Sequence, residues 1–119
     1  MKFAIPIAVL LVVTPVAHGQ SGGFIGADSS PVVTAVTAAD RPNESNVRLV
    51  GFLIENLGDE RYLFRDDSGT IVVEIDNDDW NGVQASAETR VEIAGEVDRE
   101  WRILQRETEI DVDSIKLAD

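Results

Sequence analysis

One acidic stretch near the middle of the chain has residue types and spacing that could bind a divalent cation. Its alternating oxygen donors are Asn77, Asp79, Asn81 and Glu88. Gly82 stands where an EF-hand loop needs its sharp turn. The match is incomplete, because the first ligand is Asn, Gln84 replaces the usual apolar anchor, and the flanks read as strands. A calcium-type loop is therefore an alternative interpretation. In the simpler one, Asn81-Gly82 turns the chain and Trp80 packs under the domain.

A second group of acidic residues alternates with apolar residues along three predicted strands. Alternation places these carboxylates on the outer surface of a sheet, and they comprise Glu74, Asp76, Glu92, Glu96, Glu109, Asp111 and Asp113. Such a face attracts cations and repels phosphate. We take Glu74 and Asp76, with nearby Tyr62, as candidate binding residues. The plainer alternative is a solvated acidic surface.

One short segment is basic in an otherwise acidic chain. It spans Arg99–Arg106 and contains Trp101 and Arg102. Because Trp and Arg are enriched at interface hot spots, Arg99, Trp101 and Arg102 are the other candidate partner-binding residues. We predict that this segment connects the last two strands and shapes partner choice. Alternatively, Trp101 folds back onto the domain and the arginines pair with acids.

Catalysis finds little support. The chain has no cysteine, and its single histidine, His18, precedes the predicted domain, so Ser-His-Asp and Cys-His systems are excluded there. Zinc is disfavoured for the same reason. We predict no enzymatic activity and no cofactor. With 10 basic and 22 acidic residues and a net charge of −12, the chain is also expected not to bind nucleic acid.

The first 19 residues have the layout of a secretory signal peptide. Lys2 precedes an apolar run over residues 3–13, and Ala17 and Gly19 are small residues suited to cleavage before Gln20. Residues 1–19 are thus expected to be removed during export to the periplasm. Loss of Lys2 leaves nine basic and 22 acidic residues, a balance of −13. No later segment is apolar enough to span a membrane.

The remaining chain divides into a tail and one domain. Residues 20–33 are rich in Gly and Ser and are expected to be flexible, and residues 34–119 form the domain. A short helix is predicted over Thr34–Asp40, with Thr34 as its N-cap. Five strands are predicted at Val47–Glu55, Arg61–Arg65, Thr70–Asp76, Arg90–Asp98 and Glu107–Ser114. Turns are expected at residues 56–59 and 66–69.

This pattern predicts an all-β fold. Gly51 and Gly95 lie inside strands, where a small barrel needs bends. The best fit is a small five-stranded OB-fold Greek-key barrel with a short N-terminal helix and a short helix or turn between the third and fourth strands. A β-sandwich or an SH3-like barrel fits the strand count nearly as well.

Four segments together resemble one family. They are residues 62–70 (YLFRDDSGT), 73–76 (VEID), 80–82 (WNG) and 91–98 (VEIAGEVD). The chain resembles the bacterial OB-fold (BOF) family, the YgiW/YdeI-like periplasmic stress-tolerance proteins, although the Arg99–Arg106 segment is longer and more basic than is usual there. The resemblance implies an exported, non-enzymatic binding module.

The resemblance also suggests a role in tolerance of envelope stress caused by peroxide, metal, acid or cationic peptide. The expected partner is an envelope protein or a cationic ligand, and the expected state is a monomer. Two other functions remain open. One is a divalent-cation-binding protein that uses the acidic face or the 77–88 loop, and the other is a structural interaction domain without a small ligand.

Overall fold

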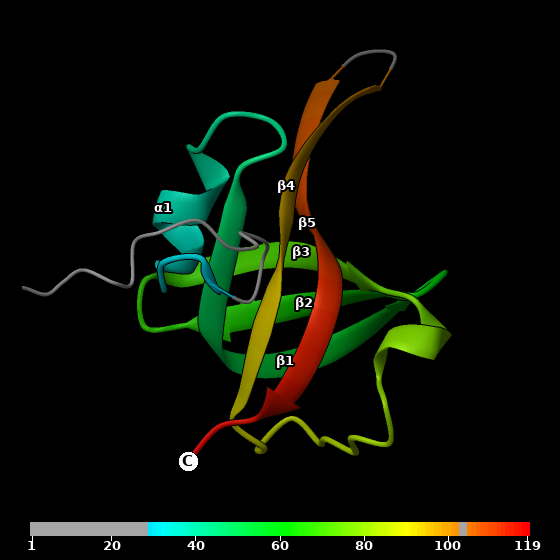
Figure 1. Ribbon diagram of the computed structural model, residues 1–119. Helices are drawn as coiled ribbons and strands as arrows, with labels where there is room; N and C mark the ends of the chain where they lie inside the picture. Colours follow the sequence, from blue (N-terminus) through cyan, green and yellow to red (C-terminus); the bar gives the residue numbers. More distant parts are fainter. Residues whose placement is uncertain (1–28, 103–104) are drawn as a thin grey trace, which may run out of the picture.

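The computed structural model describes residues 29–102 and 105–119. Its elements are helix α1 (Ala35–Ala39), strands β1 (Asn46–Gly58), β2 (Arg61–Asp66) and β3 (Gly69–Ile75), the 3-10 turn η3 (Asn77–Asp79), and strands β4 (Val91–Arg102) and β5 (Gln105–Leu117). The strands close into a barrel in the order β1-β2-β3-β5-β4, and β3 and β5 are parallel (Figure 1). The predicted five-stranded OB-fold barrel is confirmed.

The barrel interior is filled by the apolar residues that alternate along the strands. Burial removes them from water and provides the main driving force for folding. The largest side chains that are fully buried include Leu49, Phe64, Ile75, Ile93 and Ile110. The predicted inward faces of β3 and β4 are confirmed. Phe52, in contrast, is only partly buried.

Gly51 marks the bend at which β1 changes partners. Residues 46–51 pair with β4, and the strand pairs with β2 from Phe52 onward. A Cβ atom at Gly51 would collide with the Arg65 carbonyl oxygen and lie 2.7 Å from Phe64 Cζ. Only glycine permits this close approach of backbones, which confirms the predicted bend.

Gly95 lies at a β-bulge between β4 and β5. The register moves from Ala94 opposite Ser114 to Gly95 opposite Val112, so Asp113 is the extra residue. A bulge bends the strand and shifts its alternation by one. This explains why Ile115 falls out of the alternation of β5 and is nevertheless buried.

Helix α1 is held at its start by two caps. Thr34 is the N-cap, as predicted, and its hydroxyl accepts a hydrogen bond from Thr37 N. The Ala35 N–H donates to Asp66 Oδ2 at 2.8 Å, which ties the helix to the β2–β3 hairpin. Burial opposes ionisation of Asp66, but hydrogen bonds from Ser68, Ala35 and the hairpin backbone outweigh it and lower the pKa of this carboxyl.

The prediction that Arg99–Arg106 is a connection between strands is wrong, because most of this segment belongs to β4 and β5. β4 continues to Arg102 and β5 begins at Gln105, with Trp101 paired to Arg106. The two strands therefore form a long hairpin that rises beyond the barrel (Figure 1). Antiparallel pairing supplies hydrogen-bond partners for the backbone of this segment.

Two other boundaries differ from the prediction. The first hairpin turns at Asp59 and Glu60, both with positive φ (55° and 66°), so the expected turn at residues 56–59 begins too early. The second difference is at the boundary between the expected tail and the domain, where Val33 N donates to Arg48 O at 2.8 Å and Arg48 N donates to Pro31 O at 3.1 Å. The end of the expected flexible tail is thus paired with β1.

The predicted signal peptide at residues 1–19 and most of the tail lie outside the described residues. Within the described ranges, no helix is long and apolar enough to cross a bilayer.

Candidate functional site

The pairing of three strands brings carboxylates from distant parts of the sequence into one line. Glu74 of β3 is opposite Asp111 of β5, and Asp111 is opposite Glu96 of β4. We call Glu74, Asp111 and Glu96 the acidic row. Asp111 and Glu96 are exposed and Glu74 is half-buried. The predicted acidic outer surface is therefore present on these strands.

The surroundings of Asp111 raise the pKa of its carboxyl. Partial burial of its carboxyl is the main cause that raises the pKa to about 6, and the negative charges of Glu74, Asp113, Asp76 and Asp98 add to it. A shallow hollow of about 180 Å³ lies beside this carboxylate, and it is lined by Asn43, Glu44, Glu96, Val97, Asp98 and Asp111. A cation that entered this hollow would relieve the repulsion.

Glu109 corrects the predicted outer face. This residue is 1% exposed, although its position in β5 predicts that it faces solvent. Arg61 of β2 donates from Nε to both carboxylate oxygens, at 3.2 and 3.3 Å. Buried carboxylates need such partners, because removal of a charge from water is costly. Glu109 is thus part of the fold and not of an open acidic surface.

A second group of three carboxylates, which shares Glu74 with the acidic row, lies at the end of β3. Oxygens of Glu60, Glu74 and Asp76 all lie within 4.8 Å of one another. Among residues 29–102 and 105–119, this group meets the geometric requirement for several carboxylates around one ion. It contains the predicted candidates Glu74 and Asp76 but neither Asp79 nor Glu88 of the 77–88 loop.

The 77–88 loop does not have the surroundings of an EF-hand. It contains a single 3-10 turn, η3, and is flanked by strands β3 and β4. Trp80 packs against the core and makes a T-shaped contact with Tyr62, with ring centroids 5.6 Å apart. Asn81 and Gly82 take positive φ values of 49° and 80°. The turn at Asn81-Gly82 and the packing of Trp80 agree with the simpler interpretation of this loop.

The remaining candidate residues divide into two groups. Tyr62 and Trp80 border a hollow of about 260 Å³ between β1 and the β3–β4 connection. Arg99 is engaged within the fold. Its guanidinium donates to Ala39 O at 2.7 Å, to Arg41 O at 2.8 Å and to Thr108 Oγ1 at 3.2 Å. Arg99 therefore joins the end of α1 to the hairpin. The side chains of Trp101 and Arg102 lie outside the described structure.

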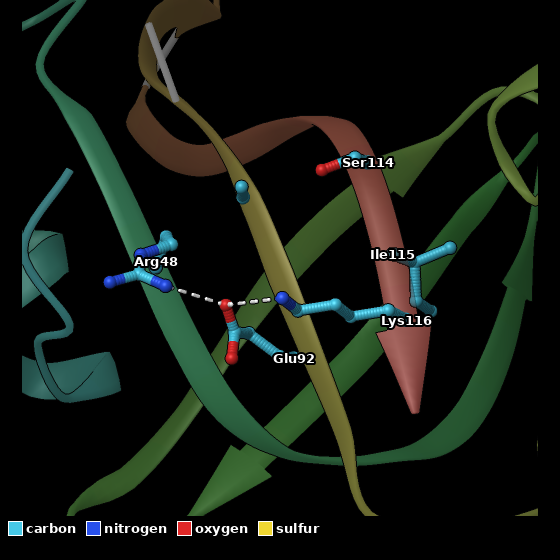
Figure 2. Close-up of a pocket in the computed structure, with 6 residues that line it drawn as sticks. Arg48, Glu92, Ser114, Ile115 and Lys116 are labelled. Carbon is cyan, nitrogen blue, oxygen red and sulfur yellow. Dashed lines mark hydrogen bonds and ion pairs between the residues drawn. The ribbon is translucent and has the colours of Figure 1, made fainter. Parts of the chain in front are cut away.

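Sequence reasoning missed a third hollow, where β1, β4 and β5 meet. Arg48, Glu92 and Lys116 converge there (Figure 2). Arg48 and Glu92 are 44 residues apart, and their ion pair of 2.8 Å depends on the β1–β4 register. Nothing in the spacing of the sequence signals this convergence.

The fold and the acidic outer surface define a small OB-fold domain of the kind that binds ligands on its surface. The family model described as "Bacterial OB fold (BOF) protein" matches residues 12–117. The chain therefore belongs to the bacterial OB-fold family, as the sequence predicts.

Relatives extend over most of the chain. It is 38% identical to Protein YgiW of Escherichia coli K12, with 97% of this chain and 95% of that protein covered. It is 34% identical to the calcium-regulated OB-fold protein CarO of Pseudomonas aeruginosa, over 76% of this chain and 78% of CarO.

Solved structures agree with this assignment. The structure of the hypothetical protein YgiW from E. coli superposes with a TM-score of 0.70 at 41% identity, and covers 82% of this chain and 100% of that one. The S. pombe Stn1–Ten1 complex gives a TM-score of 0.59 at 17% identity over 78% of this chain and 80% of that one. The second likeness shows the fold alone.

Proposed function

We propose that this protein is an exported, non-enzymatic binding module of the bacterial envelope, whose acidic row takes a cationic partner. The observation that carries the proposal is the alignment of Glu74, Asp111 and Glu96 across three strands. Rigid strands hold these charges in place, so a partner does not pay for ordering them. Envelope stress tolerance, which the family resemblance suggests, fits a protein that captures cationic toxins or peptides.

Electrostatics favour a cation over a nucleic acid. OB-folds in other proteins bind oligonucleotides on their strands, but nucleic-acid binding requires Lys and Arg to replace the phosphate counterions. Here the aligned strands carry carboxylates and the whole chain has a net charge of −12. We expect no measurable affinity for single-stranded DNA or RNA at physiological salt.

A cationic peptide tests the proposal directly. Hexalysine should bind the purified protein, and the affinity should fall when salt screens the charges. The triple variant Glu74→Gln, Asp111→Asn, Glu96→Gln should bind about tenfold more weakly or worse. The control Glu55→Gln, Asp67→Asn, Glu88→Gln removes the same charge from exposed sites elsewhere. Equal losses in both triple variants would mean that only net charge matters, and the proposed site would be wrong.

Export and stress tolerance need separate measurements. N-terminal sequencing of protein recovered from the periplasm should begin at or near Gln20, and an intact Met1 would contradict export by cleavage. A deletion strain should survive peroxide or cationic peptide less well than its parent. Complementation by the acidic-row triple variant should fail if the row is responsible.

Divalent-cation binding is a second candidate. It is supported by the close approach of Glu60, Glu74 and Asp76 and by the calcium-regulated relative CarO. Oxygen-only ligands suit Ca²⁺ or Mg²⁺. Addition of Ca²⁺ should then raise the melting temperature, and Asp76→Asn should abolish the rise while exposed Asp67→Asn retains it. No rise in the wild-type protein would exclude this function.

A further inference from the structure

The hollow at the junction of β1, β4 and β5 is built from three neighbouring strands. We call it the β1–β4–β5 pocket. It has a volume of about 290 Å³ and is lined by Arg48, Glu92, Ala94, Ser114, Ile115 and Lys116. In Figure 2 the basic groups of Arg48 and Lys116 point toward Glu92 from opposite sides. The pocket lies beyond the bulge at Asp113, away from the acidic row.

A small residue creates the hollow. Arg48, Ala94 and Ser114 form one row across β1, β4 and β5. The other members of this row carry longer or polar side chains, so the methyl group of Ala94 leaves an empty floor between them. Ala94 itself is 4% exposed. The pocket thus combines a small apolar floor with a polar rim, as small-molecule sites do.

Arg48 is fixed in place before any ligand arrives. Its Nε donates to Ser30 O at 2.8 Å, and Nη1 donates to Glu92 Oε2 at 2.8 Å. Among the described residues, Nη2 has no hydrogen-bond partner, and the side chain is 27% exposed. Because the guanidinium has five N–H donors, these two bonds fix its orientation and leave other donors of this pocket-lining residue available.

Lys116 adds a second positive charge. Its ammonium lies 3.8 Å from Glu92 Oε2, and its side chain is 70% exposed. One carboxylate therefore serves two cations, which leaves the pocket with a net charge of +1 in a strongly acidic protein. The excess positive charge is what an anion would neutralise.

We infer that the β1–β4–β5 pocket binds a small organic carboxylate. The carboxylate would accept hydrogen bonds from Arg48 and Lys116, and a short alkyl chain would lie over Ala94. The net charge of +1 matches a monoanion, whereas a phosphate dianion would also meet repulsion from Glu92. This inference does not depend on the acidic row, which attracts ligands of the opposite charge.

Propionate is a suitable probe. We would titrate it into ¹⁵N-labelled protein at constant ionic strength, with chloride as the reference and phosphate as a competing anion. Saturable changes in amide chemical shift are expected at Arg48, Glu92, Ser114 and Lys116 in the millimolar range. Chloride should produce none. Preferential binding of phosphate would overturn the carboxylate assignment.

A charge series sharpens the test. Lys116→Gln removes the excess charge and should weaken propionate binding about fivefold. Glu92→Gln keeps an oxygen that can accept from Arg48 but removes the competing anion, so it should strengthen binding by a similar factor. The matched control is Arg65→Gln, because Arg65 is exposed on β2 and does not line the pocket. It should change the affinity less than about twofold.

Two further results would overturn the inference. One is the absence of saturable shifts at the pocket up to tens of millimolar propionate. The other is an equal effect of Lys116→Gln and Arg65→Gln, which would mean that only the net charge of the protein is felt. The amide spectrum reports folding of each variant in the same experiment, so loss of binding and loss of structure are distinguished.

Discussion

The acidic row and the β1–β4–β5 pocket share strands β4 and β5, but their carboxylates have opposite electrostatic surroundings. In the pocket, Glu92 is matched by Arg48 and Lys116. In the row, Asp111 faces Glu74 and Glu96 across the sheet. The two regions are separated by the bulge at Asp113. Cross-strand register, and not local composition, therefore decides whether a carboxylate is compensated or exposed to repulsion.

The largest expected effect comes from removal of the boundary between the two regions. Gly95→Val would force a side chain into the Asp111 carbonyl and toward Val112 Cα, which lies 2.8 Å from a Cβ placed there. We expect destabilisation of about 3 kcal/mol or failure to fold. Urea unfolding measures it, with Thr70→Val on the exposed face of β3 as the control. A stability close to wild type would show that the bulge is not required.

Glu109 shows how an ion pair stabilises a buried carboxylate close to the acidic row. Arg61→Ala deprives this buried carboxylate of its β2 partner. We expect a loss of about 2 to 3 kcal/mol in the free energy of unfolding, because a buried charge then has fewer partners. Arg65 is exposed on the same strand, so Arg65→Ala should lower the free energy of unfolding by less than about 0.5 kcal/mol. Similar costs for both variants would contradict this role of Arg61.

Asp111 makes the stability of the acidic row depend on pH. Its pKa is raised to about 6 from 3.8, so the folded state holds the proton more tightly than the unfolded state. The stability contributed by this group is complete below about pH 4 and is lost as pH rises through about 6.

Asp111→Asn should therefore raise the melting temperature at pH 7 by a few degrees and change it little at pH 4. The expected gain is small because the carboxyl is exposed to screening solvent. Calorimetry at the two pH values measures it, with Asp67→Asn as the control. A gain of equal size at both pH values would contradict the assigned repulsion.

The smallest expected effect is in the pocket. Lys116→Gln should change the free energy of unfolding by less than about 0.5 kcal/mol, because its ion pair is long and exposed. Chemical denaturation at low salt checks this. A loss above 1 kcal/mol would mean that Lys116 stabilises the fold and is not reserved for a ligand.

The strand pattern was readable because alternation depends on neighbouring residues. Ile71, Val73 and Ile75 alternate with polar residues, so their burial follows from the two-residue period of a strand. The N-cap Thr34 and the bends at Gly51 and Gly95 were also predictable, since each depends on local backbone requirements. These local signals, together with the four family-like segments, were sufficient for the barrel.

Other features required contacts between residues far apart in the sequence. The hairpin arm was missed because Arg99–Arg106 has the composition of a connection, and only pairing between β4 and β5 makes it extended. Glu109 has the sequence pattern of a surface residue, and its burial depends on Arg61, 48 residues away.

The sequence by itself thus determined the fold class, the acidic character and the lack of a catalytic histidine or cysteine in the domain, because these depend on composition and on short-range periodicity. Tertiary structure decided which charges meet. The acidic row and the convergence of Arg48 and Lys116 on Glu92 arise from the register of three strands and one bulge. Register is a collective property of the closed barrel, and a shift of one residue would exchange the inner and outer faces of a strand.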